Sequence, residues 1–436
     1  MKNKLNIYIW CLAIVLLLSM VMTACTPGTQ SGGAQQEEKT DATYYTVTFD
    51  FNDGSGRVET VKVREGDTIQ KYAPSYSDAT GEIIGWSGVA NGAEYTAKIT
   101  SDTRVYAQWR KYEKVVYSSN IPESINDRVV EVKLSGSADA LYGKVLRIGA
   151  GVRSISFVSD GTLYENFAII IQSRNEDIDI VFDNFSYKSH QSFGLQGADT
   201  TSNYSVNLKV TGSSSIDCSA YILSAGNTGA CISAPNLNII GSGTLTLVAS
   251  KGTNGTDRPV AGNGKDGEHG TNGANGGNGI MSSGKVTVTM TSLVVMAGNG
   301  GRGGNGGQGN NGNGLSSAKY KDGGNGGQGG KGGCAIIAST FVADNARLEL
   351  SGGNGGNGGA GGACGGSSYT FAGHGGHGGK GGNGGNVFMS VKNMEVNGCV
   401  ENYRVGNGGK GGDPGQSPND SKDGIAGASG SNGSVQ

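Results

Sequence analysis

The side chains best suited to ligand recognition lie in short islands within the glycine-rich C-terminal part of the chain. They are three aromatic residues and three cations: Tyr320, Tyr369, Phe371, Lys319, Lys321 and Arg258. Aromatic rings and cations on loops that rest on a rigid scaffold are typical of binding surfaces. We therefore expect these residues to form a ligand-binding tip. The alternative is that a tip buries its own aromatic ring as a local plug.

Two other patterns have residue types that serve catalysis or metal binding. Asp177, Asp179 and Asp183 alternate in "DIDIVFDN" and would share one strand face, where they could bind calcium or a sugar, although solvent-facing strand positions explain them as well. His374 and His377 could approach one metal ion, but no third ligand accompanies them. The sequence contains no GxSxG motif, phosphate-binding loop or CxxC pair. It therefore predicts no catalytic residue, no metal site and no cofactor, and it gives calcium no support.

The charge balance narrows the class of partner. The chain has 34 basic and 36 acidic residues and a net charge of -2, so no large uniform field favours nucleic acid. We expect no nucleic-acid partner. The ligand should be uncharged or should bind through local contacts. Cys231 and Cys334 precede similar strands, which favours stacked buried cysteines over a disulfide framework.

The N-terminus predicts where the chain is located. The apolar run 9–22 is short for a membrane span and suits a signal peptide. Ala24 before Cys25, with Met22 at minus three, resembles the lipobox of bacterial lipoproteins; the alternative is an ordinary secretory signal. The resemblance implies that residues 1–24 are removed, that Cys25 carries a lipid in the membrane, and that the protein lies on the extracellular side of a Gram-positive-type cell membrane. Residues 25–43 are polar and predict a tether.

Residues 44–111 form a short module of their own. The segment "YYTVTFDF" alternates and ends in an Asn-Asp-Gly turn, and "VETVKV" and "DTRVYAQW" predict further strands. With its Gly-Trp pair and its "YAQW" segment at matching spacing, the module resembles the internalin-type B repeat. That resemblance implies a small β-grasp-like domain of the kind found on bacterial surface proteins. We expect Trp86 and Trp109 to pack in the core rather than to stack on carbohydrate.

Residues 112–250 contain short apolar segments separated by Gly, Asn, Asp or Ser, which suits a sandwich, a barrel or a β-solenoid. The segment "NLNIIGSGTLTLVAS" resembles the rungs of right-handed parallel β-helices in bacterial surface and carbohydrate-binding proteins. Similar strand pairs recur from 231, 280, 334 and 386, about 50 residues apart, as stacked repeats do. We therefore predict a parallel solenoid over 112–250 whose rungs continue through 251–436.

Within 251–436 the recurring strands alternate with GGx triplets. A polyproline-II-type helix repeats every three residues, so GGx leaves two bare edges on which neighbouring backbones can meet. The inner arms are GGx, whereas the first and last, "GKDGEHGTNGANG" and "GIAGASGSNG", are only Gxx, as an arm at a rim requires. In pattern the region resembles the polyglycine-II bundles of some phage adhesin tips and glycine-rich antifreeze proteins. We expect edge glycines such as Gly379 to be essential and x residues such as Lys380 to tolerate replacement.

Collagen and a flexible linker are the rivals to this bundle. Collagen needs frequent proline, which this region lacks, and a flexible linker leaves the change from GGx to Gxx unexplained. The sequence therefore predicts an all-β chain, in which a small β-grasp-like module precedes a parallel β-solenoid that carries a bundle of polyglycine-II helices.

The expected function is that of a surface-anchored binding protein, or adhesin, that displays recognition loops to an extracellular glycan or a surface protein. The alternative is a carbohydrate-active β-helix enzyme, a polysaccharide lyase or hydrolase. Ice binding is less favoured, because the x side chains are bulky and mixed rather than small and uniform.

Overall fold

The computed structural model describes residues 42–77, 81–136, 138–197, 203–311, 320–366, 373–418 and 422–436. Within these ranges the regular structure is nearly all strand, with 3-10 turns η1 (Ile69–Lys71) and η2 (Ala138–Leu141). Among the described residues no helix has the length and apolar character needed to cross a membrane. The prediction of an all-β fold is confirmed by this strand content. The chain divides into two compact units.

The N-terminal strands form a small mixed sheet. Its strands are β1 (Tyr44–Asp50), β2 (Val58–Arg64), β3 (Gly81–Ser87) and β4 (Thr103–Lys111), in the order β2-β1-β4-β3. Strand β1 pairs antiparallel with β2 and parallel with β4, which gives the predicted β-grasp-like sheet. Trp86 is only 5% exposed, and the Trp109 ring meets the edge of Tyr76 at 6.0 Å between centroids. The expectation of core packing is therefore confirmed for Trp86, and Trp109 is half-buried.

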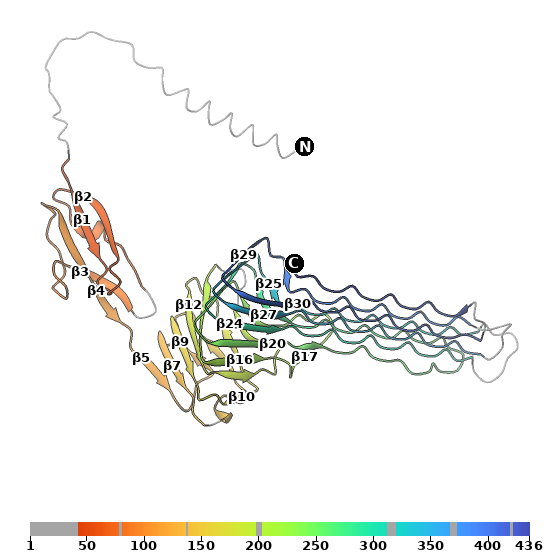
Figure 1. The fold of residues 1–436 in the computed structure, drawn as a ribbon. Helices are drawn as coiled ribbons and strands as arrows, with labels where there is room; N and C mark the ends of the chain where they lie inside the picture. The colour runs from red at the N-terminus through yellow and green to blue at the C-terminus, as the bar shows by residue number, and fades with distance from the viewer. Residues whose placement is uncertain are drawn as a thin grey trace, which may run out of the picture. The chain divides into compact units, whose positions relative to one another are not determined.

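The described residues from β5 onward form a parallel β-solenoid with three long sheets, from which glycine-rich runs extend (Figure 1). The nine-stranded sheet contains β5 (Lys114–Tyr117), β7 (Val129–Lys133), β9 (Ser154–Val158), β12 (Ile178–Asp183), β15 (Ser205–Thr211), β19 (Asn236–Ile240), β23 (Lys285–Thr289), β26 (Thr340–Asp344) and β29 (Asn393–Asn397). The seven-stranded sheet contains β10 (Leu163–Glu165), β13 (Ser186–Lys188), β16 (Ser213–Asp217), β20 (Thr244–Val248), β24 (Ser292–Met296), β27 (Arg347–Ser351) and β30 (Val400–Arg404).

The eight-stranded sheet contains β6 (Ser124–Ile125), β8 (Val145–Ile148), β11 (Ala168–Ile171), β14 (Phe193–Gly197), β18 (Ala230–Ala234), β22 (Asn278–Ser282), β25 (Ile336–Ile337) and β28 (Phe388–Met389). A fourth, two-stranded sheet pairs β17 (Ile222–Leu223) with β21 (Lys251–Gly252). A full rung therefore has one strand in each long sheet, rather than the strand pair that the sequence predicts. Strands β25 and β28 are too short to show an alternation in sequence.

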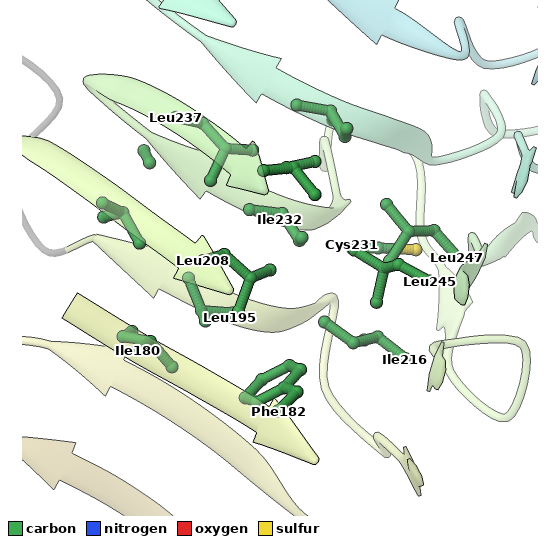
Figure 2. Close-up of a cluster of buried hydrophobic side chains, with 14 of the residues drawn as sticks. Ile180, Phe182, Leu195, Leu208, Ile216, Cys231, Ile232, Leu237, Leu245 and Leu247 are labelled. Atoms are coloured by element: carbon green, nitrogen blue, oxygen red, sulfur yellow. The ribbon is translucent and has the colours of Figure 1, made fainter. Parts of the chain in front are cut away.

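The core of the solenoid is built from apolar residues that occupy equivalent positions in successive rungs and stack on one another. In the nine-stranded sheet Ile180 pairs with Leu208, and Leu208 pairs with Ile239; all three are fully buried. Figure 2 shows the side chains of successive rungs filling the space between the sheets. Cys231 lies in this core and, like the other described cysteines, forms no disulfide. Burial raises the pKa of its thiol, and the prediction of buried, unpaired cysteines holds for Cys231 and Cys334.

Residues in the left-handed backbone conformation form the turn that follows each strand of the nine-stranded sheet from β12 onward. The residues directly after β12, β15, β19, β23, β26 and β29 all have positive φ: Asn184, Gly212, Gly241, Met290, Asn345 and Gly398. Gly and Asn adopt this conformation readily, whereas other side chains are strained there. Met290, with φ 55°, is the exception, and its side chain is 63% exposed. The site therefore carries backbone strain beneath a largely exposed side chain.

Met290→Asn is expected to stabilise the protein by about 1 kcal/mol, because it relieves the strain of a left-handed methionine. Thermal or urea unfolding would measure the gain. The matched control is Asn345→Met at the corner of the next rung, where φ is 50°, and it should lower stability by a similar amount. A loss on Met290→Asn would show that the methionine makes a stabilising contact.

Candidate binding surface

The glycine-rich arms leave the solenoid at the ends of strands in the seven-stranded sheet. Outbound runs 253–261, 298–310 and 352–364 follow β20–β21, β24 and β27, and return runs 264–277, 321–333 and 373–386 lead back to the eight-stranded sheet. The last arm, made of runs 405–416 and 422–434, follows β30. Figure 1 shows the arms running side by side away from the sheets.

The first glycine of each triplet joins an arm to the equivalent arm of the next rung. Its N–H donates to the carbonyl oxygen of an x residue there, as in Gly270 to Asn325 (2.8 Å), Gly326 to His377 (2.8 Å) and Gly378 to Ile425 (2.8 Å). The arms therefore continue the stacking of the rungs beyond the strands. The donor groups that an isolated polyproline-type helix leaves unpaired are satisfied by its neighbours.

The second glycine joins outbound and return arms. One continuous chain of N–H to carbonyl bonds, each 2.7–3.2 Å long, crosses the whole bundle through Gly427, Gly412, Gly379, Gly359, Gly327, Gly304, Thr271 and Thr256. The glycines at these contacts leave no room for a side chain: a Cβ atom on Gly379 would overlap the carbonyl oxygen of Gly327. The predicted polyglycine-II bundle is thereby confirmed, and neither a flexible linker nor collagen describes these arms.

In the Gxx arms at the two ends of the bundle, the glycine of each triplet lies at the contact with a neighbouring arm, as predicted. In the first return arm a Cβ atom on Gly270 would overlap the carbonyl of Gly304, whereas Thr271 and Asn272 already carry side chains there. In the last arm Gly427 faces Gly379, and its neighbours Ala426 and Ala428 are exposed. One glycine per triplet is therefore enough in the return arms of the first and last rungs, each of which has a neighbouring rung on one side only.

The x side chains have a role that the sequence analysis missed. Many x residues donate their backbone N–H to an x side chain of the previous rung: Asn325 donates to His269 Nδ1 (2.8 Å) and His377 to Asn325 Oδ1 (2.8 Å). Ile425 in turn donates to His377 Nδ1 (2.9 Å). A histidine accepts only through an unprotonated ring nitrogen. The frequent Asn at x therefore accepts the third N–H of a triplet, that of the x residue in the next rung. Only x side chains that have no acceptor atom, such as Lys380, are expected to tolerate replacement.

Three of the predicted tip residues can be placed, at the distal end of the bundle. Arg258 pairs with Glu268 (3.3 Å) and its Nε donates to the His269 carbonyl (3.2 Å). Lys321 Nζ lies 4.0 Å from Asp266 Oδ1, and the Lys321 N–H donates to Asn311 Oδ1 (2.9 Å).

The ring of the third, Tyr320, covers Gly366, where a Cβ atom would come within 2.9 Å of the ring. The half-buried Tyr320 therefore helps to close the end of the bundle. Lys319, Tyr369, Phe371 and Cys25 lie outside the described residues.

The aspartates of the nine-stranded sheet accept hydrogen bonds from their neighbours. The Ser205 N–H donates to Asp177 (2.7 Å), and Asn207 Nδ2 donates to Asp179 (2.9 Å). Asn184 Nδ2 reaches Asp183 at 3.2 Å. In the described part of the chain no three His, Cys, Asp or Glu residues lie close enough to share a metal ion. These carboxylates therefore tie rungs and corners together.

No protein-family model matches the chain, and no curated protein matches it significantly. Among solved structures, the chain is similar to the springtail antifreeze protein from Granisotoma rainieri, described as a nine polyproline type II helical bundle with crystal waters that match the ice lattice. The match has 25% sequence identity, covers 42% of this chain and 96% of that chain, and has a TM-score of 0.12. A TM-score of this size does not establish a shared fold.

Proposed function

We propose that the protein is a surface-anchored binding protein, or adhesin, whose glycine bundle holds recognition loops at its distal end for an extracellular glycan or surface protein. The observation that carries the proposal is the hydrogen-bond chain across the bundle, from Thr256 to Gly427. A bundle paired in this way keeps its distal end in a fixed position, so binding does not have to order a flexible arm. The long arms separate that end from the solenoid.

Binding is proposed in preference to catalysis because the candidate carboxylates are engaged in hydrogen bonds within the fold. Asp177, Asp179 and Asp183 each accept a hydrogen bond from the fold itself. A general acid or base needs a carboxyl group that can reach its substrate. No observation favours the lyase or hydrolase alternative over these structural contacts.

The anchor is part of the same proposal. Cys25 would carry the lipid after removal of residues 1–24, residues 25–43 would act as a tether, and the internalin-like module at 44–111 would act as a spacer. The protein would then lie on the outer side of a Gram-positive-type cell membrane. The support is the lipobox-like sequence before Cys25.

Cys25→Ala should block lipidation and release the protein from membranes, or leave it unprocessed. Fractionation of cells that express the full chain, with an immunoblot for the processed form, measures this. Cys11→Ala, inside the signal segment, is the matched control and should change nothing. A Cys25→Ala variant that is processed and still remains wholly with the membrane fraction would rule out the lipid anchor.

The display proposal is tested by the double change Tyr369→Ala and Phe371→Ala in the full-length protein. Binding on a glycan array and to immobilised surface proteins should fall at least ~10-fold, as expected for the loss of aromatic contacts worth about 1.4 kcal/mol or more. The melting temperature should not change. Lys380→Ala, on an arm, is the control and should bind normally. Unchanged binding by a stable double variant would overturn the assignment of the distal loops.

A further inference from the structure

The exposed face of the outbound arms next to the seven-stranded sheet carries three cations, Lys251, Arg404 and Lys410. We propose that this face is a second binding site, for a linear anionic polysaccharide. The basic face consists of six exposed residues: Lys251, Asn299, Asn354, Asn407, Arg404 and Lys410. The site rests on the proposed function only in taking a glycan as its partner, and it does not involve the distal loops.

Backbone bonds fix four of these residues in one column across successive rungs. Gly252, next to Lys251, donates to the carbonyl of Asn299 (2.9 Å), and Gly300 donates to that of Asn354 (2.8 Å). Gly355 donates to the carbonyl of Asn407 (2.8 Å). Rungs stack at about 4.8 Å, so the column crosses roughly 15 Å of a surface that is held rigid.

In the last rung the basic face also extends along the arm. Asn407 and Lys410 are three residues apart along the run 405–416, so their side chains emerge on the same edge about 9 Å apart. Arg404, the last residue of β30, precedes Asn407 by the same spacing. Tyr403 packs toward the core, and strand alternation therefore turns Arg404 outward. The column and this row meet at Asn407.

The face presents donors and almost no acceptors. The x carbonyls accept the bonds between arms, and the side-chain oxygens of Asn299 and Asn354 accept the N–H groups of Asn354 (2.8 Å) and Asn407 (2.9 Å). Each of these two amide groups thus keeps its NH2 for a ligand. Within the described ranges, none of the ion pairs involves Lys251, Arg404 or Lys410.

These properties select the class of ligand. Three unpaired cations and a row of amide donors complement a polymer rich in carboxylate and hydroxyl oxygens. The face has no aromatic ring on which nucleic-acid bases could stack. At the distal border Asp257 pairs with Arg302 (2.8 Å), and Asp413 follows Lys410 by one triplet. The length of the column suits an extended chain rather than a small molecule.

The test measures binding of the full-length protein to polygalacturonate, to dextran of similar length and to a single-stranded oligonucleotide. We expect salt-sensitive binding to polygalacturonate, because the exposed charges are screened by salt, and little binding to the other two. The triple variant Lys251→Gln, Arg404→Gln, Lys410→Gln should bind polygalacturonate at least ~100-fold more weakly, since it removes three charge-assisted contacts.

The matched control removes the same charge from the return arms: Lys331→Gln, Lys380→Gln and Lys422→Gln. It should retain wild-type affinity, and both triple variants should melt at the wild-type temperature. Equal losses in the two variants, no binding to polygalacturonate, or equal binding to the oligonucleotide would each overturn the proposal. The Tyr369 and Phe371 double variant should leave this binding unchanged, so failure of one site is distinguishable from failure of the other.

Discussion

Gly379→Ala is expected to destabilise the glycine bundle by roughly 1–4 kcal/mol, because a methyl group at this position disrupts several backbone hydrogen bonds of about 0.5–1.5 kcal/mol each. The Gly379 N–H donates to Gly359 (2.7 Å), and its carbonyl accepts from Gly412 (2.8 Å). The new Cβ atom would overlap the carbonyl oxygen of Gly327. That oxygen accepts from Gly359, so the arms would have to separate at bonds on both sides of the substitution.

Amide exchange would locate the damage. Protection should fall at the amides of Gly359, Gly412 and residue 379 itself, which donate the affected bonds, while the amides of the solenoid strands should keep theirs. Lys380→Ala is the neighbouring control: the Lys380 side chain is exposed, and an ammonium group cannot accept an N–H. Equal exchange rates in the two variants across 373–386 would mean that the arms are not packed in this way.

Phe185→Ala is expected to lower the free energy of unfolding of the solenoid by about 3–5 kcal/mol, the usual cost of removing a buried aromatic ring. Phe185 is fully buried. Its ring stacks on Phe157 with centroids 4.8 Å apart, and it lies 5.2 Å from Phe182 and 5.3 Å from Tyr187. The residue therefore joins rungs through rings that belong to different strands and corners.

Phe185→Leu fills most of the same space and should cost less than half as much. Urea unfolding followed by far-UV circular dichroism would measure both variants. A loss below about 1 kcal/mol for Phe185→Ala would show that the surrounding rings close over the cavity. Unlike Gly379→Ala, Phe185→Ala should reduce amide protection in the solenoid strands more than in the glycine-rich arms.

The fold was predictable where the pattern of the sequence and the packing have the same period. Alternation in "NLNII" and "GTLTLV" corresponds to β19 and β20, in which alternate residues are buried. The GGx triplets predicted the bundle because only glycine fits between arms whose backbones touch. The third strand of each rung was missed, because β25 (Ile336–Ile337) and β28 (Phe388–Met389) are too short to show a period.

The details of the surface were less predictable, because they depend on contacts between residues about 50 positions apart. Asn325 and His377 are ordinary polar residues in the sequence, and their capping role appears only when the rungs are stacked. The strain at Met290 is likewise invisible without the corner. Lys251 and Arg404 lie on one face only because the rungs between them stack in register.

The chain of bonds from Thr256 to Gly427 also determines how the protein would respond to mechanical load. A pull along the arms acts at right angles to these bonds, so it loads them in shear, and rows of bonds along the arm share the force. A sideways pull on the last arm instead loads its bonds one after another, as in peeling. Resistance to force should therefore be anisotropic, greatest along the arms and least for stripping the last arm from the bundle.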